Sequence, residues 1–327
     1  MRSRSPEMGT GAKYTMRKGS MSGSSGYIRR AAAGATSFDV APRVISSKDF
    51  QRFQALIYRE SGIALSDAKA GLLTGRLSKR LRALGLNTFS EYHNRVTLDD
   101  EERRAMLDAI TTNETHFFRE PGHFQFLEQK VLPVWRSSAE SRRRARTIRA
   151  WSAGCSTGQE AYSLAMLLVD WFPASQGWSV EILATDLSRR VLAIAEEGVW
   201  NKDQVHEIPP RYLRAYTLKG LGGNQGKLKA APAIRVIRFV RLNLNDAVYP
   251  DIGKFDLIFC RNVLIYFDAD SRARTTKRLL QHLEPEGYFF VGHAESLSSI
   301  CPGLRRVMAT VYTPAENRSA PRHATRR

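Results

Sequence analysis

The chain has 327 residues, of which 43% are hydrophobic and 25% charged, and this is enough for one large or two medium-sized folded domains. Its 50 Lys and Arg outnumber its 32 Asp and Glu, and the formal net charge of +18 predicts an acidic partner: a nucleic acid, a membrane surface or an acidic protein. The sequence has no run of 18 apolar residues, no secretory signal, no CxxC pair and no HExxH spacing, so we expect a cytoplasmic protein without a transmembrane helix, a disulfide framework or a metal site.

Both ends of the chain are basic and poor in large apolar residues. Residues 1–43 contain eight Lys and Arg but only two acids, Glu7 and Asp39, in a setting rich in Gly, Ser and Ala. Such a composition buries too little apolar surface to offset the entropy lost on folding. We therefore predict a disordered basic tail over 1–43 and a second disordered tail over 316–327.

Residues 44–112 are predicted to form a small all-helical domain. Ser46 and Ser47 precede an amphipathic helix that ends near Gly62, and its apolar positions are Phe50, Phe53, Leu56 and Ile57. A second helix is predicted from about Asp67 to Gly85, with an apolar stripe made of Leu73, Leu77, Leu81 and Leu84. The other faces of this helix are basic and carry Arg76, Lys79, Arg80 and Arg82. Shorter helical patterns follow at 88–96 and 98–110.

The pattern changes near Arg146, where short β-rich runs begin to alternate with helices. The runs are "TIRAWS", "WSVEILATD", "IRFVRLNL", "FDLIFC" and "GYFFVGH". This alternation predicts an α/β domain over 146–315, a parallel sheet with helices on both faces, joined to the first domain by a linker and helix over 113–145. Over about 200–235 the alternation fails, which suggests an inserted hairpin or small subdomain, and "RVMATVYTP" predicts one further edge strand.

A glycine loop joins the first predicted strand to the next helix in "AWSAGCSTGQE". It lacks the Lys of a phosphate-binding P-loop, and its Gly154-x-x-x-Gly158 spacing differs from the dinucleotide pattern GxGxxG. Glu160 begins the helix and Asp186 ends the following strand, and ligands of such sheets bind outside the carboxyl ends of the strands. An acid beside the loop repels phosphate but suits an ammonium or sulfonium group, and Asp186 suits ribose hydroxyls, which together favour S-adenosylmethionine. The alternative is a tight turn followed by two capping acids.

Two further stretches place polar side chains where a site is expected. "CRNVLIYFD" follows a buried strand and carries Arg261, Asn262 and Tyr266. "TTNETHFFRE" lies at the junction of the two domains, where ligands commonly bind, and carries Asn113, Thr115 and Arg119. Taken alone, the first stretch is also compatible with structural capping and the second with a plain linker. The histidines His116, His123 and His293 are interpreted as packing or surface residues.

These stretches, together with "LIYRESGIALSDAKAGLLTGRLSKRLRALGL" and "GHAES", closely resemble the CheR family, whose members use S-adenosylmethionine to esterify glutamates of bacterial chemoreceptors. The resemblance runs from about Ser46 to Pro314, in order and with compatible spacing. It implies a helical N-terminal domain, a Rossmann-like methyltransferase domain, and a small antiparallel β-subdomain inserted where the alternation fails. The implied reaction converts glutamate carboxylates into methyl esters for chemotactic adaptation and releases S-adenosylhomocysteine.

The resemblance also implies site residues. Cofactor binding is implied for Asn113, Thr115, Arg119, Gly154, Glu160, Asp186, Asn243, Leu244, Arg261 and Asn262. Arg119 and Tyr266 are implied to flank the transferring methyl group. The basic residues Arg76, Lys79, Arg80 and Arg82 then become candidates for docking on the Glu-rich helical bundle of a receptor. The family usually reads GEEPYS after the loop, and this chain departs from it at Gln159 and Ala161 of "GQEAYS".

A glutamate acceptor, with a pKa of about 4.3, is already ionised at neutral pH, so the implied reaction needs no general base. The expected partner is the cytoplasmic helical bundle of a chemoreceptor, and in some family members the β-subdomain also binds a receptor C-terminal peptide. The expected form is a monomer that binds no nucleic acid and does not insert into a membrane.

Two other classes of protein fit the sequence less well. A nucleic-acid methyltransferase would need a base pocket such as an NPPY motif, which "RNVLIYFD" is not. A cofactor-sensing scaffold without turnover is disfavoured because Arg119, Asp186, Asn262 and Tyr266 are all present.

Overall fold

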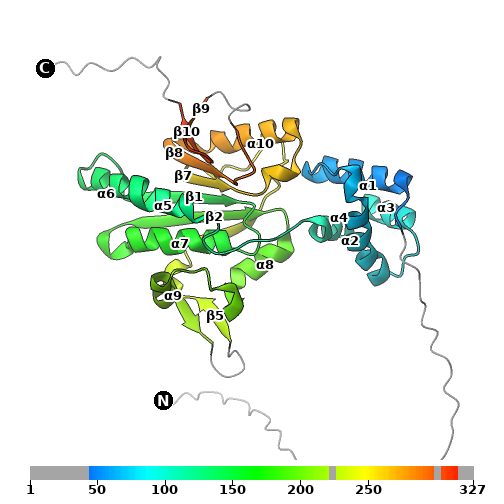
Figure 1. Cartoon of the computed structure of the whole chain (residues 1–327), viewed down its shortest axis with the longest axis horizontal. Coiled ribbons are helices and arrows are strands. Elements are labelled where there is room, and N and C mark those ends of the chain that lie inside the picture. The colour runs from blue at the N-terminus through cyan, green and yellow to red at the C-terminus, as the bar shows by residue number, and fades with distance from the viewer. Residues whose placement is uncertain (1–43, 221–225, 298–302, 316–327) are drawn as a thin grey trace, which may run out of the picture. The chain divides into compact units, whose positions relative to one another are not determined.

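The structure, a computed structural model, describes residues 44–220, 226–297 and 303–315, all within the structural unit Pro42–Arg327 (Figure 1). The two predicted tails, 1–43 and 316–327, lie outside the described residues. Within the described ranges, no helix is both long and apolar enough to span a membrane.

Four amphipathic helices make up the N-terminal part of the described chain. Their bounds are α1 Ser47–Ser61, α2 Ala70–Ala83, α3 Phe89–Leu98 and α4 Asp100–Ile110. Helix α1 begins where the Ser46 hydroxyl accepts the backbone N–H of Asp49, and it ends at Gly62, whose φ of 73° favours glycine. The apolar faces of the four helices meet in one core around Phe53 and Tyr92.

Helix α2 starts later than predicted and ends at the predicted glycine. Residues Asp67–Lys69 form a 3-10 turn, and the α-helix starts only at Ala70. Gly85 has a φ of 66° directly after the C-cap residue, which confirms its role in ending the helix. Leu84 is 36% exposed, so its predicted place in the buried leucine stripe is wrong. The helix has already ended at Ala83, and Leu84 no longer follows the helical face.

A seven-stranded mixed sheet forms the centre of the second part, with strand order β6-β2-β1-β7-β8-β10-β9. The strands are β1 Thr147–Ala153, β2 Ser179–Asp186, β6 Ile237–Arg241, β7 Phe255–Cys260, β8 Leu283–Val291, β9 Leu304–Met308 and β10 Val311–Pro314. The strands from β6 to β8 pair in parallel, as predicted. The predicted single edge strand in "RVMATVYTP" is wrong, because a turn at Ala309 and Thr310 splits it into an antiparallel hairpin, β9 and β10, which pairs antiparallel with β8.

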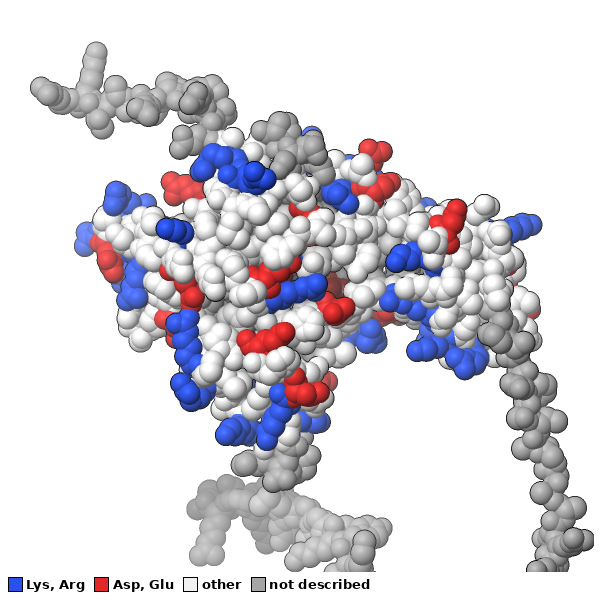
Figure 2. All heavy atoms as spheres, in the orientation of Figure 1, with Lys and Arg blue, Asp and Glu red and all other residues white. Residues whose placement is uncertain are grey.

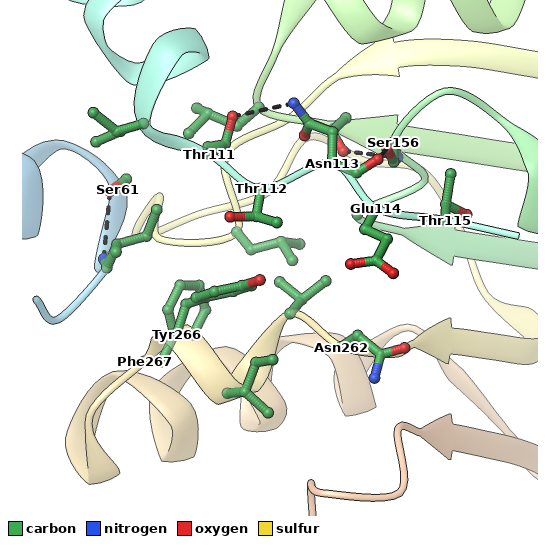
Figure 3. A pocket seen from close by; sticks show the side chains of 18 of the residues that line it. Ser61, Thr111, Thr112, Asn113, Glu114, Thr115, Ser156, Asn262, Tyr266 and Phe267 are labelled. Carbon is green, nitrogen blue, oxygen red and sulfur yellow. Dashed lines mark hydrogen bonds between the residues drawn. The ribbon is translucent and has the colours of Figure 1, made fainter. Parts of the chain in front are cut away.

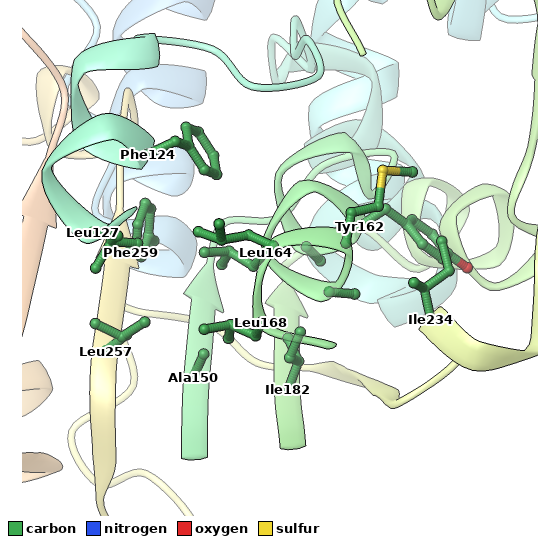
Figure 4. Close-up of a cluster of buried hydrophobic side chains, with 14 of the residues drawn as sticks. Phe124, Leu127, Ala150, Tyr162, Leu164, Leu168, Ile182, Ile234, Leu257 and Phe259 are labelled. Atoms are coloured by element: carbon green, nitrogen blue, oxygen red, sulfur yellow. The ribbon is translucent and has the colours of Figure 1, made fainter. Parts of the chain in front are cut away.

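Helices cover both faces of this sheet, as predicted. They are α5 Pro121–Phe126, a π-helical segment Leu127–Val131, α6 Leu132–Glu140, α7 Gln159–Trp171, α8 Arg189–Glu197 and α10 Ala269–Gln281. On one face, Leu164 of α7 packs in a cluster with Ala150 of β1 (Figure 4). On the other face, Trp151 of β1 belongs to a second cluster with Leu279 of α10. Neighbouring residues of β1 thus serve two cores, as the alternation of side chains along a strand requires.

The stretch in which the alternation fails folds as a small subdomain. Its elements are β3 Val199–Asn201, α9 Pro210–Tyr216, β4 Thr217–Lys219 and β5 Lys227–Ala230, and β5 pairs antiparallel with β3 and β4 on either side. Further 3-10 turns occur at Ala174–Gln176, Lys202–Gln204, Pro232–Ile234 and Leu264–Tyr266. The expected fold class is confirmed: a Rossmann-like α/β sheet with an N-terminal helical part and an inserted antiparallel subdomain.

Candidate active site

One cavity of about 510 Å³ lies at the carboxyl ends of β1, β2 and β7, where α/β sheets bind their ligands. Its size suits a small molecule of nucleoside dimensions. All residues predicted to bind a cofactor or to act in catalysis line this cavity, namely Asn113, Thr115, Arg119, Gly154, Glu160, Asp186, Asn243, Leu244, Arg261, Asn262 and Tyr266. The fold thus brings together stretches that lie far apart in the sequence.

The glycine loop reaches the cavity with its backbone. The N–H groups of Gly154 and Cys155 both donate to the Thr185 carbonyl of β2, at 2.8 and 2.9 Å. Gly154 has a φ of 85°, and a Cβ at this position would lie 2.4 Å from Cγ2 of Val263 on the facing wall. Only glycine combines this backbone conformation with such a close approach.

Asp186 is held at the end of β2 by two backbone donors. Its Oδ2 accepts the N–H of Ser156 and its Oδ1 accepts the N–H of Ser188, each at 2.9 Å. Each carboxylate oxygen keeps a further lone pair for a ligand hydroxyl. Burial raises the pKa of the Asp186 carboxyl, and the two N–H groups act against that rise. A carboxylate fixed in this way suits the adjacent hydroxyls of a ribose.

Glu160 forms a buried charge cluster with Arg261. Its Oε1 accepts the Ser152 hydroxyl at 2.7 Å, and its Oε2 lies 3.3 Å from Nη1 of Arg261. Burial raises the pKa of the Glu160 carboxyl, and the nearby Arg261 charge lowers it. Arg261 is 5% exposed, and its Nη2 donates to the Arg119 carbonyl at 2.5 Å. Arg261 therefore positions two groups: the Glu160 carboxylate and the backbone of the domain junction at Arg119.

The junction between the two parts of the chain forms a wall of the cavity. Figure 3 shows the segment from Thr111 to Thr115 across the cavity from the segment that contains Asn262 and Tyr266. The Ser156 hydroxyl donates to the Asn113 carbonyl at 2.9 Å and so joins this wall to the glycine loop. The loop and the junction are thereby positioned together.

The segment after β7 contributes an amide and a phenol. Asn262 has a φ of 61°, and its Oδ1 is buried without a hydrogen-bond partner among the described residues. A buried acceptor without a partner is the kind of group that a ligand donor satisfies. Figure 3 shows the Tyr266 hydroxyl directed into the cavity. The Tyr266 carbonyl accepts the N–H of Ala64 at 2.8 Å, which ties this segment to the N-terminal part.

Asn243 and Leu244 line the cavity with polar groups that already have partners within the protein. The Asn243 amide donates to the Glu60 carbonyl at 2.7 Å and accepts the N–H of Asn245 at 3.0 Å. The Leu244 carbonyl accepts the Tyr249 hydroxyl at 2.8 Å. These contacts fix the shape of the wall, and Leu244 supplies apolar surface.

The two departures from the family pattern lie beside the cavity and do not line it. Gln159 is buried, and its Oε1 accepts the Thr157 hydroxyl at 2.8 Å. Ala161 is fully buried in the core between α7 and the sheet. Glu160, the acid between them, is the one that faces the cavity.

One of the three histidines, His123, is buried in the core, and the other two, His116 and His293, are exposed. His123 is fully buried, its Nε2 lies 2.6 Å from the Thr310 hydroxyl, and burial lowers its pKa to about 3. Ligand atoms of Glu120, His123 and His293 lie within 4.8 Å of one another, a spacing that suits a metal. However, Nη2 of Arg261 lies 3.5 Å from Oε2 of Glu120, and this fixed positive charge disfavours a cation there.

The basic residues of α2 have different surroundings. Figure 2 shows Lys and Arg side chains gathered over this helix. Two of them are bound to α4: Arg76 donates to the Ile110 carbonyl, and Arg80 pairs with the buried Glu102 at 2.5 Å. Nε of Arg82 donates to the Ser78 carbonyl of its own helix at 3.3 Å. Lys79 and Arg82 are exposed. Arg76 also lines the cavity, so the four side chains differ in their surroundings.

Sequence reasoning missed the part of the cavity wall that follows α1. Ser61, Ile63 and Leu65 line the cavity, and Ile63 forms an antiparallel backbone bridge with Phe267. These residues follow the usual pattern of a helix end and a short connection, so periodicity gives no sign of a site. The pairing of Ile63 with Phe267, 204 residues further along the chain, brings this connection to the cavity.

The groups around the cavity fit S-adenosylmethionine. Glu160 places a carboxylate at the cavity, which suits an ammonium group, and Asp186 places acceptors there, which suit ribose hydroxyls. Asn262 offers a buried acceptor without a partner among the described residues. Apolar surface for a base comes from Leu187, Leu242, Leu244 and Val263. Residues 113–312 match the family profile described as "CheR methyltransferase, SAM binding domain", and with this fold they define an S-adenosylmethionine-dependent methyltransferase. Residues 48–111 match the companion profile, "CheR methyltransferase, all-alpha domain". The chain belongs to the CheR methyltransferase family.

Curated relatives agree with this assignment. The chain is 38% identical to chemotaxis protein methyltransferase 2 of Pseudomonas aeruginosa over 82% of its own length and 93% of that protein. It is 36% identical to the chemotaxis protein methyltransferase of Borreliella burgdorferi, over 82% of this chain and 94% of the relative. The corresponding Escherichia coli protein is 36% identical, over 78% of this chain and 87% of the relative.

Proposed function

We propose that the chain transfers the methyl group of S-adenosylmethionine to glutamate carboxylates of a bacterial chemoreceptor. The observation that carries the proposal is the meeting of Glu160, Asp186, Arg119 and Tyr266 at one cavity in a chain of this family. The relatives' names, chemotaxis protein methyltransferase, support a receptor as the substrate. The chain would then act in the cytoplasm, as a monomer, on the cytoplasmic helical bundle of the receptor.

The residues divide the work of binding. Glu160 holds the ammonium group of the methionine portion, with Arg261 and Ser152 keeping its carboxylate in place. Asp186 accepts the ribose hydroxyls. S-adenosylmethionine supplies an electrophilic methyl on a positively charged sulfur, and the protein supplies fixed groups that bind and orient it.

Methyl transfer is an in-line displacement in which a glutamate oxygen forms the new O–C bond as the C–S bond breaks, and the sulfur keeps the electron pair. The acceptor is already ionised, so the side chains need only align it. Such alignment is worth about 7–11 kcal/mol in well-oriented reactions. Arg119 orients the carboxylate by a charged hydrogen bond, and Tyr266 positions the methyl group or the attacking oxygen.

The test is incubation of the protein with methyl-labelled S-adenosylmethionine and a receptor cytoplasmic fragment. Label that is released by mild base as methanol is expected, because methyl esters hydrolyse in base whereas N-methyl groups do not. An Asp186→Asn variant, which weakens cofactor binding, serves as the matched negative control. Base-stable label, or label on nucleic acid in a mixed-substrate assay, would reject the proposal.

We propose that Lys79 and Arg82 make most of the contacts of α2 with the receptor. Both are exposed, whereas Arg76 and Arg80 are bound to residues of α4. Reversing both charges, Lys79→Glu with Arg82→Glu, should raise KM for the receptor fragment about 3- to 30-fold at low ionic strength and less in high salt. The same reversal at Arg142 and Arg143, which are also exposed, is the matched control. An equal effect of both pairs would show a general charge effect without specific docking.

We further propose that the inserted subdomain binds a receptor C-terminal peptide by adding it to an outer strand. The sheet has two outer strands, β3 and β4, and β5 lies between them. An added strand would use the backbone groups that an outer strand leaves unpaired. Titration of a receptor C-terminal peptide by calorimetry, with a scrambled peptide as control, tests this; equal heats for both peptides would reject it.

A further inference from the structure

A buried carboxylate that the proposed reaction does not use lies just behind the cavity. Glu295 is fully buried, four residues after β8, in the stretch "GHAES". Its Oε2 accepts the N–H of Asn262 at 2.8 Å and the N–H of Gly292 at 2.6 Å. Its Oε1 accepts the N–H of Ile265 at 3.0 Å. One side chain therefore binds three backbone groups from the ends of two neighbouring strands.

These three partners are all donors, and the oxygens of a carboxylate, which only accept, match them. Backbone N–H groups that converge on a carboxylate compensate the cost of burying its charge. Glu295 thus binds two N–H groups, those of Asn262 and Ile265, and holds the segment after β7 in place.

The segment held by Glu295 turns sharply after β7. Asn262 has a φ of 61°, in the left-handed region, which Asn adopts more readily than most residues but less readily than glycine. A Cβ on Gly292 would lie 2.7 Å from Nδ2 of Asn262 and 2.8 Å from Oε2 of Glu295. The turn after β8 therefore comes so close to Asn262 that glycine is required there, and Glu295 completes the contact.

We infer that Glu295 is a positioning residue for methyl transfer, which acts by fixing the backbone that presents Asn262 and Tyr266 to the cavity. Glu295 itself does not line the cavity, whereas Asn262, Ile265 and Tyr266 do. The inference rests on the site proposed above at Asn262 and Tyr266. It predicts that loss of the carboxylate changes both cofactor affinity, through Asn262, and turnover, through Tyr266.

The experiment compares the full chain with Glu295→Gln and Glu295→Asp. Gln keeps the size but turns an NH₂ group toward backbone donors, and Asp keeps the charge but is one methylene too short to reach all three N–H groups. The matched control is Glu286→Gln, the same change at an exposed residue of β8. Three quantities are measured: Kd for S-adenosylhomocysteine by calorimetry, kcat and KM for methyl transfer to a receptor fragment, and Tm.

For Glu295→Gln we expect Kd for S-adenosylhomocysteine to rise about tenfold or more and kcat to fall by at least as much, with Glu286→Gln unchanged. Glu295→Asp should recover part of both, because it restores the charge. A lower Tm with unchanged Kd and kcat would make the role merely structural and overturn the inference. If Glu295→Gln does not fold, Glu295→Asp decides; if neither folds, Glu295 belongs to the folding core and the inference is rejected. Because Kd needs no receptor, a wild-type chain that binds S-adenosylhomocysteine but fails to methylate the fragment would reject the proposed function alone.

Discussion

A single methyl group added at Gly154 should destabilise the protein measurably. The Gly154→Ala variant must adopt a φ of 85°, which costs an L-residue roughly 1–2 kcal/mol. Its Cβ would also lie 2.4 Å from Cγ2 of Val263, and inserting atoms into such a contact costs about 1–3 kcal/mol. The sum is about 2–5 kcal/mol of unfolding free energy, and since both residues line the cavity, affinity for S-adenosylhomocysteine should fall as well.

The two contributions can be separated with Val263→Ala, which removes the methyl group that the new Cβ meets. In urea denaturation followed by tryptophan fluorescence, the double variant should recover about 1–3 kcal/mol relative to the sum of the single variants, whereas the backbone contribution should persist. Calorimetric titration of S-adenosylhomocysteine should show the same partial rescue. If the single variants add to within about 0.5 kcal/mol, or if Gly154→Ala is as stable as the wild type, the assigned close approach is wrong.

Three further predictions concern the charges and the phenol of the cavity. Glu160→Gln should raise Kd for S-adenosylhomocysteine about 10- to 100-fold, because a charge-assisted hydrogen bond is lost; an unchanged calorimetric Kd would remove Glu160 from the site. Because burial raises the pKa of the Glu160 and Asp186 carboxyls, both lose their charge at a higher pH than exposed acids do, so affinity should fall on acidification from neutral pH. Glu160→Gln should flatten part of that fall, and a wild-type Kd independent of pH down to the ordinary range of carboxyl pKa values would contradict the assignment. Tyr266→Phe and Arg119→Ala should lower kcat more than they change Kd, with Tyr216→Phe as the control, and near-normal turnover in both would disprove their catalytic role.

Most of the fold was predictable because most of its helices and strands have local sequence signals at their ends or in their apolar pattern. The Ser46 cap and the Gly62 stop bracket α1, and the alternation of apolar runs with helices gave the parallel part of the sheet. The β9–β10 hairpin was not predictable in this way. Its turn at Ala309 and Thr310 contains no Gly, Pro, Asn or Asp, so nothing in the sequence interrupts the apolar run.

Parts of the cavity were predictable because their residues follow strands. Gly154, Asp186 and Asn262 come directly after or at the ends of β1, β2 and β7, and parallel strands bring such residues to one edge. Arg80 resembles any exposed helix residue in the sequence, yet it pairs with Glu102 on another helix. Glu295 likewise owes its place to partners 30 and 33 residues away. Contacts of this kind depend on packing, which composition and periodicity do not encode.

A short backbone pairing joins the helical part to the sheet domain. It consists of the bridge between Ile63 and Phe267 and the hydrogen bond from the Ala64 N–H to the Tyr266 carbonyl. This pairing limits how the domains of different family members can be combined in one chain. The helical part contributes backbone pairing to the very segment that carries the phenol of the cavity, as well as wall residues such as Leu72. A chimera that takes its helices from one relative and its sheet from another joins two halves of one binding cavity. Its success should depend on the match at this short pairing more than on overall similarity.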